Sequence, residues 1–358
     1  MSIKANIYLE EIVSYKPGKS EIDGSKAIKL SANENALGAS PKAMEAYKDM
    51  AHKISIYSDG SCSELRQALS KKNNINPDQI VCGAGSDELI AFITQAFCQK
   101  NDEIIYSHHG FLMYPISAKR VGAKAVRVPE KDLKTDVDAI INSVGKKTKI
   151  IFIANPNNPT GSYLNRDEVL KLIKSVPKNI LIVLDHAYDE FVTSKDYPKD
   201  SLKFVESYEN IIVTRTFSKI YGLASLRVGW CYSSKYVASI LNKIRGPFNV
   251  SGPAQISAIH ALEDDEFLLK SINHNQKWLK LYSMELGANK NFKIYDSVGN
   301  FVLIDFLNKE NCRNANKILQ NNNIIVRNMD SYDLPNALRI SVGKDQDNKL
   351  VIDNLQNY

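Results

Sequence analysis

The stretch IIVTRTFSK, residues 211–219, places a lysine shortly after an apolar, β-branched run. Such a run is typical of a buried strand in a parallel sheet, where ligands bind at the carboxyl ends of the strands. Ser218 and Lys219 occupy that end, and Arg227 follows eight residues after the lysine. The segment therefore predicts an α/β fold in which an amine and an anion-binding pair lie at one edge of a sheet.

An amine beside an anion site suits a cofactor that carries both an aldehyde and a phosphate. Lys219 could form a Schiff base with the aldehyde while Ser218 and Arg227 hold the phosphate, which is how pyridoxal phosphate (PLP) is bound. Most of the chain's many lysines are expected to be solvated, so Lys219 alone does not distinguish a cofactor site from a surface charge. Other segments of the sequence are needed to distinguish the cofactor site from the surface charge.

Short apolar, β-rich runs recur along the chain and alternate with helical stretches. Strands are expected at residues 79–82, 103–107, 123–128, 149–154, 180–185, 210–216 and 227–232. Helices are expected between them, for example at residues 86–99, 136–144 and 166–175. This alternation predicts a mostly parallel, doubly wound α/β sheet with helices on both faces.

After Pro247 the pattern changes to one long helical stretch, residues 254–289, followed by strand-like runs at residues 300–306, 324–329 and 338–342. This order predicts a smaller α+β domain that N-terminal residues complete. We therefore expect three parts. They are an N-terminal arm that is part of the small domain (residues 1–40), a large PLP-binding domain (residues 41–248) and a small C-terminal domain (residues 249–358).

The composition narrows the functional classes. The chain has 358 residues, 44% of them hydrophobic and 24% charged, with a formal charge of +6 and no basic tract, which argues against nucleic-acid binding. We expect no secretion signal and no membrane span, because the start is polar and no apolar run reaches about 18 residues. Five scattered cysteines argue against metal and disulfide frameworks, so we expect no metal and a cytoplasmic location.

The segment GAGSDE, residues 83–88, follows a short strand and opens a helical pattern. Backbone amides at a helix N-terminus bind phosphate, and glycines let the backbone approach it closely. The same segment also fits an ordinary helix start, with Ser86 as N-cap and Asp87 in the first turn. Taken alone, it favours the ordinary helix start.

Two further segments carry polar groups to the ends of buried runs. Asp185 ends the run at residues 180–184, where a carboxylate is costly without a cationic partner such as a protonated pyridine nitrogen. Tyr188 could donate to the cofactor's phenolic oxygen, although Asp185 could also simply cap the next helix. The stiff turn NPNNPTG, residues 155–161, could aim Asn158 above the sheet, but such a turn needs no function.

Taken in order, these segments resemble the fold-type I PLP-dependent aminotransferases, and specifically the histidinol-phosphate aminotransferase group. The resemblance spans roughly residues 15–343. It rests on NEN at residues 33–35, YSDG at 57–60, GAGSDE at 83–88, NNPTG at 157–161, Asp185 with Ala187 and Tyr188, TFSK at 216–219, Arg227, and LRI at 338–340. The resemblance implies a PLP-dependent transaminase that works as a homodimer.

The resemblance also implies how the cofactor is held. Lys219 would be the Schiff-base lysine and later the proton shuttle at the substrate's α-carbon. Asp185 would pair with the ring nitrogen, and Asn158 and Tyr188 would bind the phenolic oxygen. The remaining cofactor contacts would be Phe111, stacked on the ring, and a phosphate cradle of Ser86, Asp87, Ser218 and Arg227, with Tyr57 reaching the phosphate from the other subunit.

On the substrate side, the resemblance implies that Arg339 clamps the carboxylate of the amino donor as a bidentate partner. Arg327 would contact the distal phosphate of the substrate, and Tyr15 and Asn33 would line the same pocket. The implied reaction moves an amino group between L-glutamate and a phosphorylated ketone, imidazole acetol phosphate.

Other reactions stay open at this point. Ala36, Ser58 and the pair His108–His109 depart from the group's usual residues near the pocket. These departures leave room for a smaller phosphorylated ketone such as dihydroxyacetone phosphate. PLP-dependent decarboxylation of a phosphorylated amino acid, such as L-serine phosphate, is also compatible with the sequence. A non-enzymatic PLP-fold module is disfavoured, because Lys219, Asp185 and Arg227 are all present.

Overall fold

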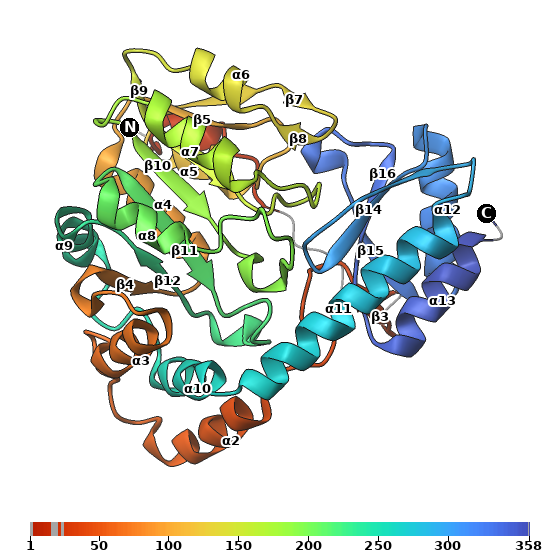
Figure 1. The fold of residues 1–358 in the computed structure, drawn as a ribbon, viewed down its shortest axis with the longest axis horizontal. Coiled ribbons are helices and arrows are strands. Elements are labelled where there is room, and N and C mark those ends of the chain that lie inside the picture. The colour runs from red at the N-terminus through yellow and green to blue at the C-terminus, as the bar shows by residue number, and fades with distance from the viewer. Residues whose placement is uncertain (1–2, 16–20, 23–24, 357) are drawn as a thin grey trace.

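Two sheets organise the computed structural model of the chain, which describes residues 3–15, 21–22, 25–356 and 358 (Figure 1). The larger sheet has the strand order β4-β12-β11-β10-β9-β5-β6. Its strands, in that order, are Ile80–Gly83, Gly229–Tyr232, Ile211–Thr216, Leu181–Asp185, Thr148–Ala154, Glu103–Ser107 and Lys124–Val128. Only β12 runs antiparallel to its neighbours, so the expected mostly parallel sheet is confirmed.

Helices cover both faces of this sheet, because its central strands are apolar on both sides. Successive side chains of a strand point to opposite faces. Ile182 and Leu184 accordingly pack into one apolar cluster, and Leu181 and Val183 into the other. The first cluster includes helices α3 (Ser63–Asn73), α6 (Val137–Asn142), α7 (Arg166–Ser175), α8 (Ser201–Ser207) and α10 (Gly252–Leu262). The second includes α4 (Ser86–Phe97), α5 (Met113–Arg120) and α9 (Lys235–Ile244).

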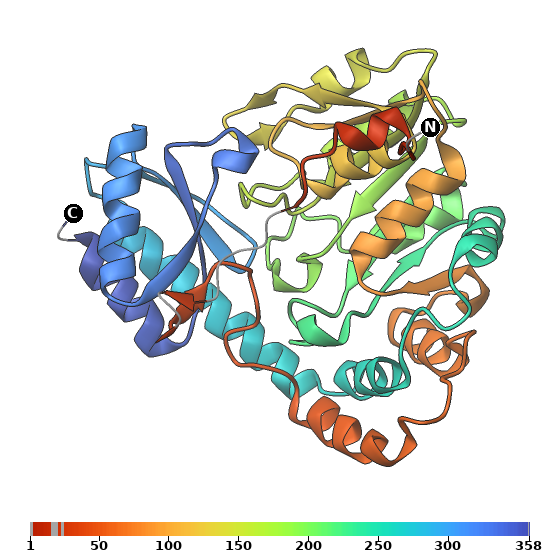
Figure 2. The same ribbon diagram turned by 180° about the vertical axis from the view of Figure 1, so that it is seen from behind.

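The smaller sheet has the order β13-β14-β16-β15-β3 and lies beside α11, α12 and α13 (Figures 1 and 2). Its strands are Lys293–Tyr295, Phe301–Asp305, Ala337–Ser341, Ile324–Asn328 and Ile28–Leu30, and α12 and α13 span Lys309–Asn321 and Asp345–Gln356. β3 pairs in parallel with β15. N-terminal residues therefore complete this sheet, as expected, while the division of the chain at residues 40 and 248 stays a prediction.

The helical stretch expected at residues 254–289 is two helices rather than one. α10 ends at Leu262, and α11 spans Asp265–Leu286. Asp264 caps α11, since its carboxylate accepts the Phe267 amide at 3.3 Å, and the same carboxylate accepts the Ser40 hydroxyl at 2.6 Å. The break lets α10 pack on α2 (Pro41–Asp49) while α11 continues to the smaller sheet (Figure 1).

The remaining elements are short. They are α1 (Ile7–Glu10), β1 (Glu21–Ile22), β2 (Ser25–Lys26), β7 (Glu130–Lys131), β8 (Lys134–Thr135), and single 3₁₀ turns at Met50–Lys53, Pro77–Gln79, Asp189–Phe191, Ala224–Leu226 and Asp330–Tyr332. Within the described residues, no helix combines the length and the apolar character that crossing a membrane requires.

Candidate active site

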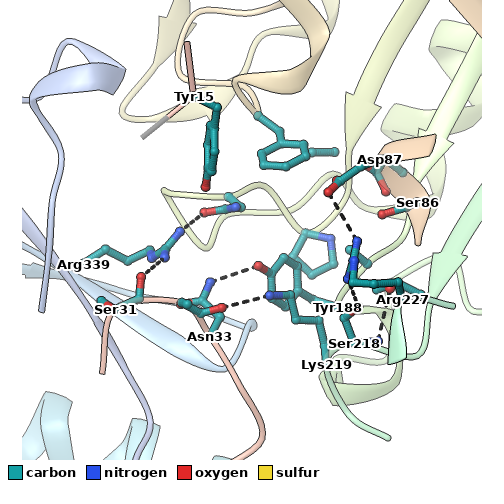
Figure 3. Close-up of a pocket in the computed structure, with 18 residues that line it drawn as sticks. Tyr15, Ser31, Asn33, Ser86, Asp87, Tyr188, Ser218, Lys219, Arg227 and Arg339 are labelled. Carbon is teal, nitrogen blue, oxygen red and sulfur yellow. Dashed lines mark hydrogen bonds and ion pairs between the residues drawn. The ribbon is translucent and has the colours of Figure 1, made fainter. Parts of the chain in front are cut away.

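A pocket lies where the carboxyl ends of β9, β10 and β11 face the smaller sheet (Figure 3). All of the site residues expected from the sequence line it, except Tyr57 and Arg327. In Figure 3, Ser86, Asp87, Ser218 and Arg227 lie on one side of the pocket, and Ser31, Asn33 and Arg339 lie on the other. The pocket therefore joins side chains from both sheets.

Lys219 follows β11 and enters the pocket between these two groups. Its Nζ donates to the Ala32 carbonyl at 3.0 Å and lies 5.7 Å from the centre of the Tyr188 ring. Burial, together with the positive charges of Arg339 and Arg227, lowers the pKa of Lys219 from 10.5 to about 8. A sizeable neutral fraction near neutral pH makes this amine a competent nucleophile and base.

Asp185 ends β10 with its carboxylate fully enclosed. Oδ2 accepts the Tyr114 hydroxyl at 2.7 Å, and Oδ1 accepts the Thr214 hydroxyl at 2.9 Å. Burial raises the pKa of Asp185 to about 6, although both hydrogen bonds act to lower it. Both partners are neutral, so among the described residues the contacts of this carboxylate leave its negative charge without a cation.

An anion site lies at the start of α4. Gly85 precedes the helix with φ of 87°, and the first amides of a helix lack partners within the helix. Arg227 donates to the Ser218 hydroxyl at 3.1 Å, and its guanidinium lies 3.5 Å from the Asp87 carboxylate. The φ of 87° at Gly85 favours glycine there, and a Cβ would lie 2.4 Å from Arg227 Nη2, so a larger residue would also displace this guanidinium.

The smaller sheet contributes Arg339 from β16. Its guanidinium donates to the Ser31 carbonyl at 2.8 Å and to the Asn158 side-chain oxygen, and lies 5.4 Å from the Phe301 ring centre. Its Nε is buried and has no hydrogen-bond partner among the described residues. Because Asn158 accepts from Arg339 through its oxygen, its NH₂ group remains available to donate into the pocket.

Asn33 links the smaller sheet to Tyr188. Its side-chain amide donates to the Tyr188 hydroxyl oxygen at 2.9 Å, and its backbone N–H donates to the Ser341 hydroxyl at 2.8 Å. The Tyr188 hydroxyl therefore accepts from Asn33 and keeps its own hydrogen for another acceptor.

Two expected site residues lie outside this pocket. Arg327 faces Arg339 directly in the register of β15 and β16, and its guanidinium lies 5.7 Å from the ring centre of Tyr15, which lines the pocket. Tyr57 is 81% exposed and stacks on Phe248 with ring centres 4.5 Å apart. In a single chain, then, Arg327 borders the pocket and Tyr57 points away from it.

The sequence did not reveal several neighbours of these groups. Tyr114 and Thr214 hold Asp185, and Thr214 could have been suspected because it shares a strand face with Thr216, a pocket residue. Arg215 lies between Thr214 and Thr216 but on the opposite face of the strand, and it donates to buried Asp189 at 2.8 Å. This ion pair ties the strand before Lys219 to the turn after Tyr188.

The histidines that depart from the family pattern are partners of acidic groups beside the pocket. His109 Nδ1 lies 2.7 Å from Glu130, and His108 Nε2 lies 3.6 Å from Asp333. Asp333 also forms an ion pair with Arg127. These contacts hold the loop that precedes Phe111, so the two histidines help to position that loop.

The raised pKa of Asp185 predicts a pH effect on the stability of the cofactor-free protein. The carboxyl ionises near pH 3.8 in the unfolded chain and near pH 6 in the folded one. The free energy of unfolding is therefore highest below pH 3.8 and falls as the pH rises through about 6, by about 3 kcal/mol in total. Urea unfolding of wild type and Asp185→Asn, from about pH 4 to about pH 7, measures this loss.

We expect the Asp185→Asn protein to lack this part of the pH dependence. The control variant Asp138→Asn, at an exposed position, should keep the wild-type profile. Parallel profiles for wild type and Asp185→Asn would contradict the prediction.

Comparison with known proteins places the fold in a family. The profile described as aminotransferase class I and II matches residues 25–355. The chain is 40% identical to a histidinol-phosphate aminotransferase of Maricaulis maris, covering 100% of this chain and 99% of that protein. It is 42% identical to the protein of that name from Rhodopseudomonas palustris, covering 97% of this chain and 96% of the relative.

Solved structures share the fold at lower identity. The histidinol-phosphate aminotransferase of Sinorhizobium meliloti in complex with pyridoxal-5'-phosphate has a TM-score of 0.89 at 24% identity, covering 100% of this chain and 98% of that one. The L-threonine-O-3-phosphate decarboxylase of Porphyromonas gingivalis has a TM-score of 0.80 at 20% identity, covering 92% and 98%. The fold expected from the sequence is confirmed, and with it the expected enzyme class: the chain belongs to the class I and II aminotransferases.

Proposed function

We propose that this PLP-dependent aminotransferase moves an amino group between L-glutamate and imidazole acetol phosphate. The observation that carries the proposal is the convergence of the Lys219 amine, the Asp185 carboxylate and the Arg227 anion site in one pocket, with two arginines on the adjoining sheet. Relatives named histidinol-phosphate aminotransferases, which match nearly the whole chain at 40–42% identity, support this choice of substrate.

The residues present fit PLP, because each polar part of the cofactor meets a group of matching character. The partners of Asp185 in the described part of the chain are neutral, and a protonated ring nitrogen would supply a cation to balance its buried charge. The start of α4, Ser218 and Arg227 would hold the phosphate. When bound, PLP supplies an aldehyde that joins to amines and a ring that withdraws electrons from the carbon bearing the amino group.

The chain's own groups then handle position and protons. Lys219 Nζ removes the proton from the α-carbon of the amino donor and returns a proton in the reverse half-reaction, which suits an amine with a lowered pKa. Asp185 keeps the ring nitrogen protonated. The Tyr188 hydroxyl and the Asn158 NH₂ group donate to the phenolic oxygen, since their other sites are occupied by Asn33 and Arg339.

The first prediction from this proposed function tests the cofactor. Lys219→Ala should abolish the covalent adduct that borohydride traps after incubation with PLP, because no other lysine of the described residues lines the pocket. Mass spectrometry of the reduced protein measures the adduct and locates it. The exposed-lysine variant Lys235→Ala should give the same adduct as wild type. An undiminished adduct in the Lys219→Ala protein would remove the basis of the proposal.

The choice of a phosphorylated acceptor rests on the two arginines. Arg327 and Arg339 are direct partners across β15 and β16, so their side chains leave the same face of the sheet about 5 Å apart at Cβ. Arg339 suits the α-carboxylate of glutamate in one half-reaction, and Arg327 suits the phosphate of a carboxylate-free ketone in the other.

The second prediction concerns Arg327. Arg327→Ala should raise the KM for imidazole acetol phosphate about ten- to a hundredfold, the effect of losing a charged hydrogen bond. Steady-state kinetics on the enzyme preloaded with glutamate measure this constant. Arg313→Ala, at an exposed position on α12, is the matched control.

Three results would contradict the substrate assignment. They are an unchanged KM in the Arg327→Ala protein, faster turnover of unphosphorylated keto acids than of every phosphorylated ketone, and release of carbon dioxide from L-serine phosphate in place of transamination. A preference for dihydroxyacetone phosphate would keep the phosphate site and change only the acceptor.

We further propose that the enzyme is a cytoplasmic homodimer in which Tyr57 serves the partner's phosphate site. Tyr57 lies outside the pocket of its own chain, and it is surrounded by exposed apolar residues. Ile54 is 76% exposed, Ile56 is 72% exposed, and Phe248, which stacks on Tyr57, is 46% exposed. An exposed apolar cluster of this kind fits contact with a second copy of the chain.

The third prediction tests this sharing. A hybrid dimer of one Tyr57→Ala chain and one Lys219→Ala chain has one site with both defects and one with neither. Mixing the two inactive proteins should therefore restore transaminase activity, whereas each protein alone stays inactive. The absence of any recovery, with subunit exchange confirmed by native mass spectrometry, would contradict shared sites.

A further inference from the structure

Tyr114 is a buried tyrosine that the reaction as described does not use. It belongs to α5, and only 1% of the residue is exposed. Its hydroxyl donates to Asp185 Oδ2 at 2.7 Å, while Thr214 donates to Oδ1 at 2.9 Å. Each carboxylate oxygen thus receives one hydroxyl donor, which determines the rotation of the carboxylate about its last bond.

The Tyr114 ring is held by three other rings. It stacks on Phe152 with ring centres 4.6 Å apart and planes 3° apart, and it meets Phe111 edge-on at 5.9 Å and 89°. A third contact, with Tyr106, has ring centres 6.3 Å apart. Packing of this kind leaves the hydroxyl little freedom. Phe111 lines the pocket, and Tyr114 contacts both the Phe111 ring and the Asp185 carboxylate. Tyr114 therefore connects the pocket wall to the carboxylate that is proposed to bind the ring nitrogen.

The charge balance around Asp185 gives this hydroxyl a second effect. Burial and the Asp87 carboxylate both favour the neutral form of Asp185, while the Tyr114 and Thr214 hydrogen bonds favour the ionised form. Burial and the neighbouring Asp185 raise the pKa of Tyr114 well above its ordinary value. The phenol therefore stays a donor throughout the working pH range.

We propose that Tyr114 is a positioning residue that holds the Asp185 carboxylate ionised and aimed at the ring nitrogen of the cofactor. This inference rests on the proposed use of PLP. Tyr114 touches neither the substrate nor the reacting carbon, and it acts only through Asp185. Its contribution should accordingly be visible only with a cofactor that has a nitrogen for Asp185 to bind.

The experiment compares two cofactors on the full-length protein freed of PLP. Tyr114→Phe removes the hydroxyl and keeps the ring with its packing. Affinities for PLP and for its 1-deaza analogue, which has carbon in place of the ring nitrogen, are measured by absorbance titration. Tyr106→Phe is the matched control, since it removes a hydroxyl from the same aromatic cluster, but one that accepts from Arg127 at 3.4 Å and not one that donates to Asp185.

We expect Tyr114→Phe to bind PLP about tenfold more weakly than wild type, the effect of losing a hydrogen bond to a charged group. Its affinity for the deaza analogue should equal that of wild type, and Tyr106→Phe should bind both compounds normally. Thr214→Val, which removes the other donor, should likewise weaken the binding of PLP and leave the affinity for the deaza analogue unchanged.

Two outcomes would overturn the inference. Undiminished PLP affinity in Tyr114→Phe would show that its hydroxyl does not support Asp185. Equal weakening towards PLP and the analogue would show a role in packing alone. Failure of the wild-type protein to bind PLP at all is a different result, because it would overturn the proposed function and this inference with it.

Discussion

The active site depends on one carboxylate that the fold buries with no counter-ion among the residues that the structure describes. Asp185 sits at the end of a strand whose five residues are all buried, and its partners are two neutral hydroxyls. A low-dielectric setting makes such a charge costly unless a cation joins it. A bound pyridinium would remove that cost, and the groups proposed to hold the phosphate and the ring line the same pocket as this carboxylate.

The two sheets contribute different groups to the pocket. The larger sheet presents Lys219, Asp185 and the anion site at the carboxyl ends of its strands, as expected of parallel sheets. The smaller sheet presents Arg339 and Arg327 as cross-strand partners. Hydrogen bonds from Arg339 to Asn158 and from Asn33 to Tyr188 connect the two sheets. The side chains that both sheets bring to the pocket are thereby held at a defined spacing, which the proposed reaction at one carbon over a ring requires.

A second buried network lies behind the pocket wall. Arg215 pairs with Asp189 and lies over the Trp230 ring at 5.8 Å. The positive charge of Arg215 and hydrogen bonding by His186 lower the pKa of Asp189 against the opposing effect of burial. Because β11 alternates its faces, the residues on either side of Arg215 point towards the site. The network therefore supports the strand that leads to Lys219 from the side opposite the cofactor.

The sequence by itself determined the sheet class, most strand positions and the groups expected around PLP. Each of those groups is placed by local structure, Asp185 and Lys219 by the end of a strand and Ser86 by the start of a helix. Their assigned roles, the domain limits and the shared dimer site stay predictions. Only the tertiary structure decided which neighbours hold these groups. Tyr114 meets Asp185 across 71 residues of chain, and Arg339 meets Asn158 across 181. Such contacts follow from how helices and sheets pack, and no local pattern of residues encodes that packing.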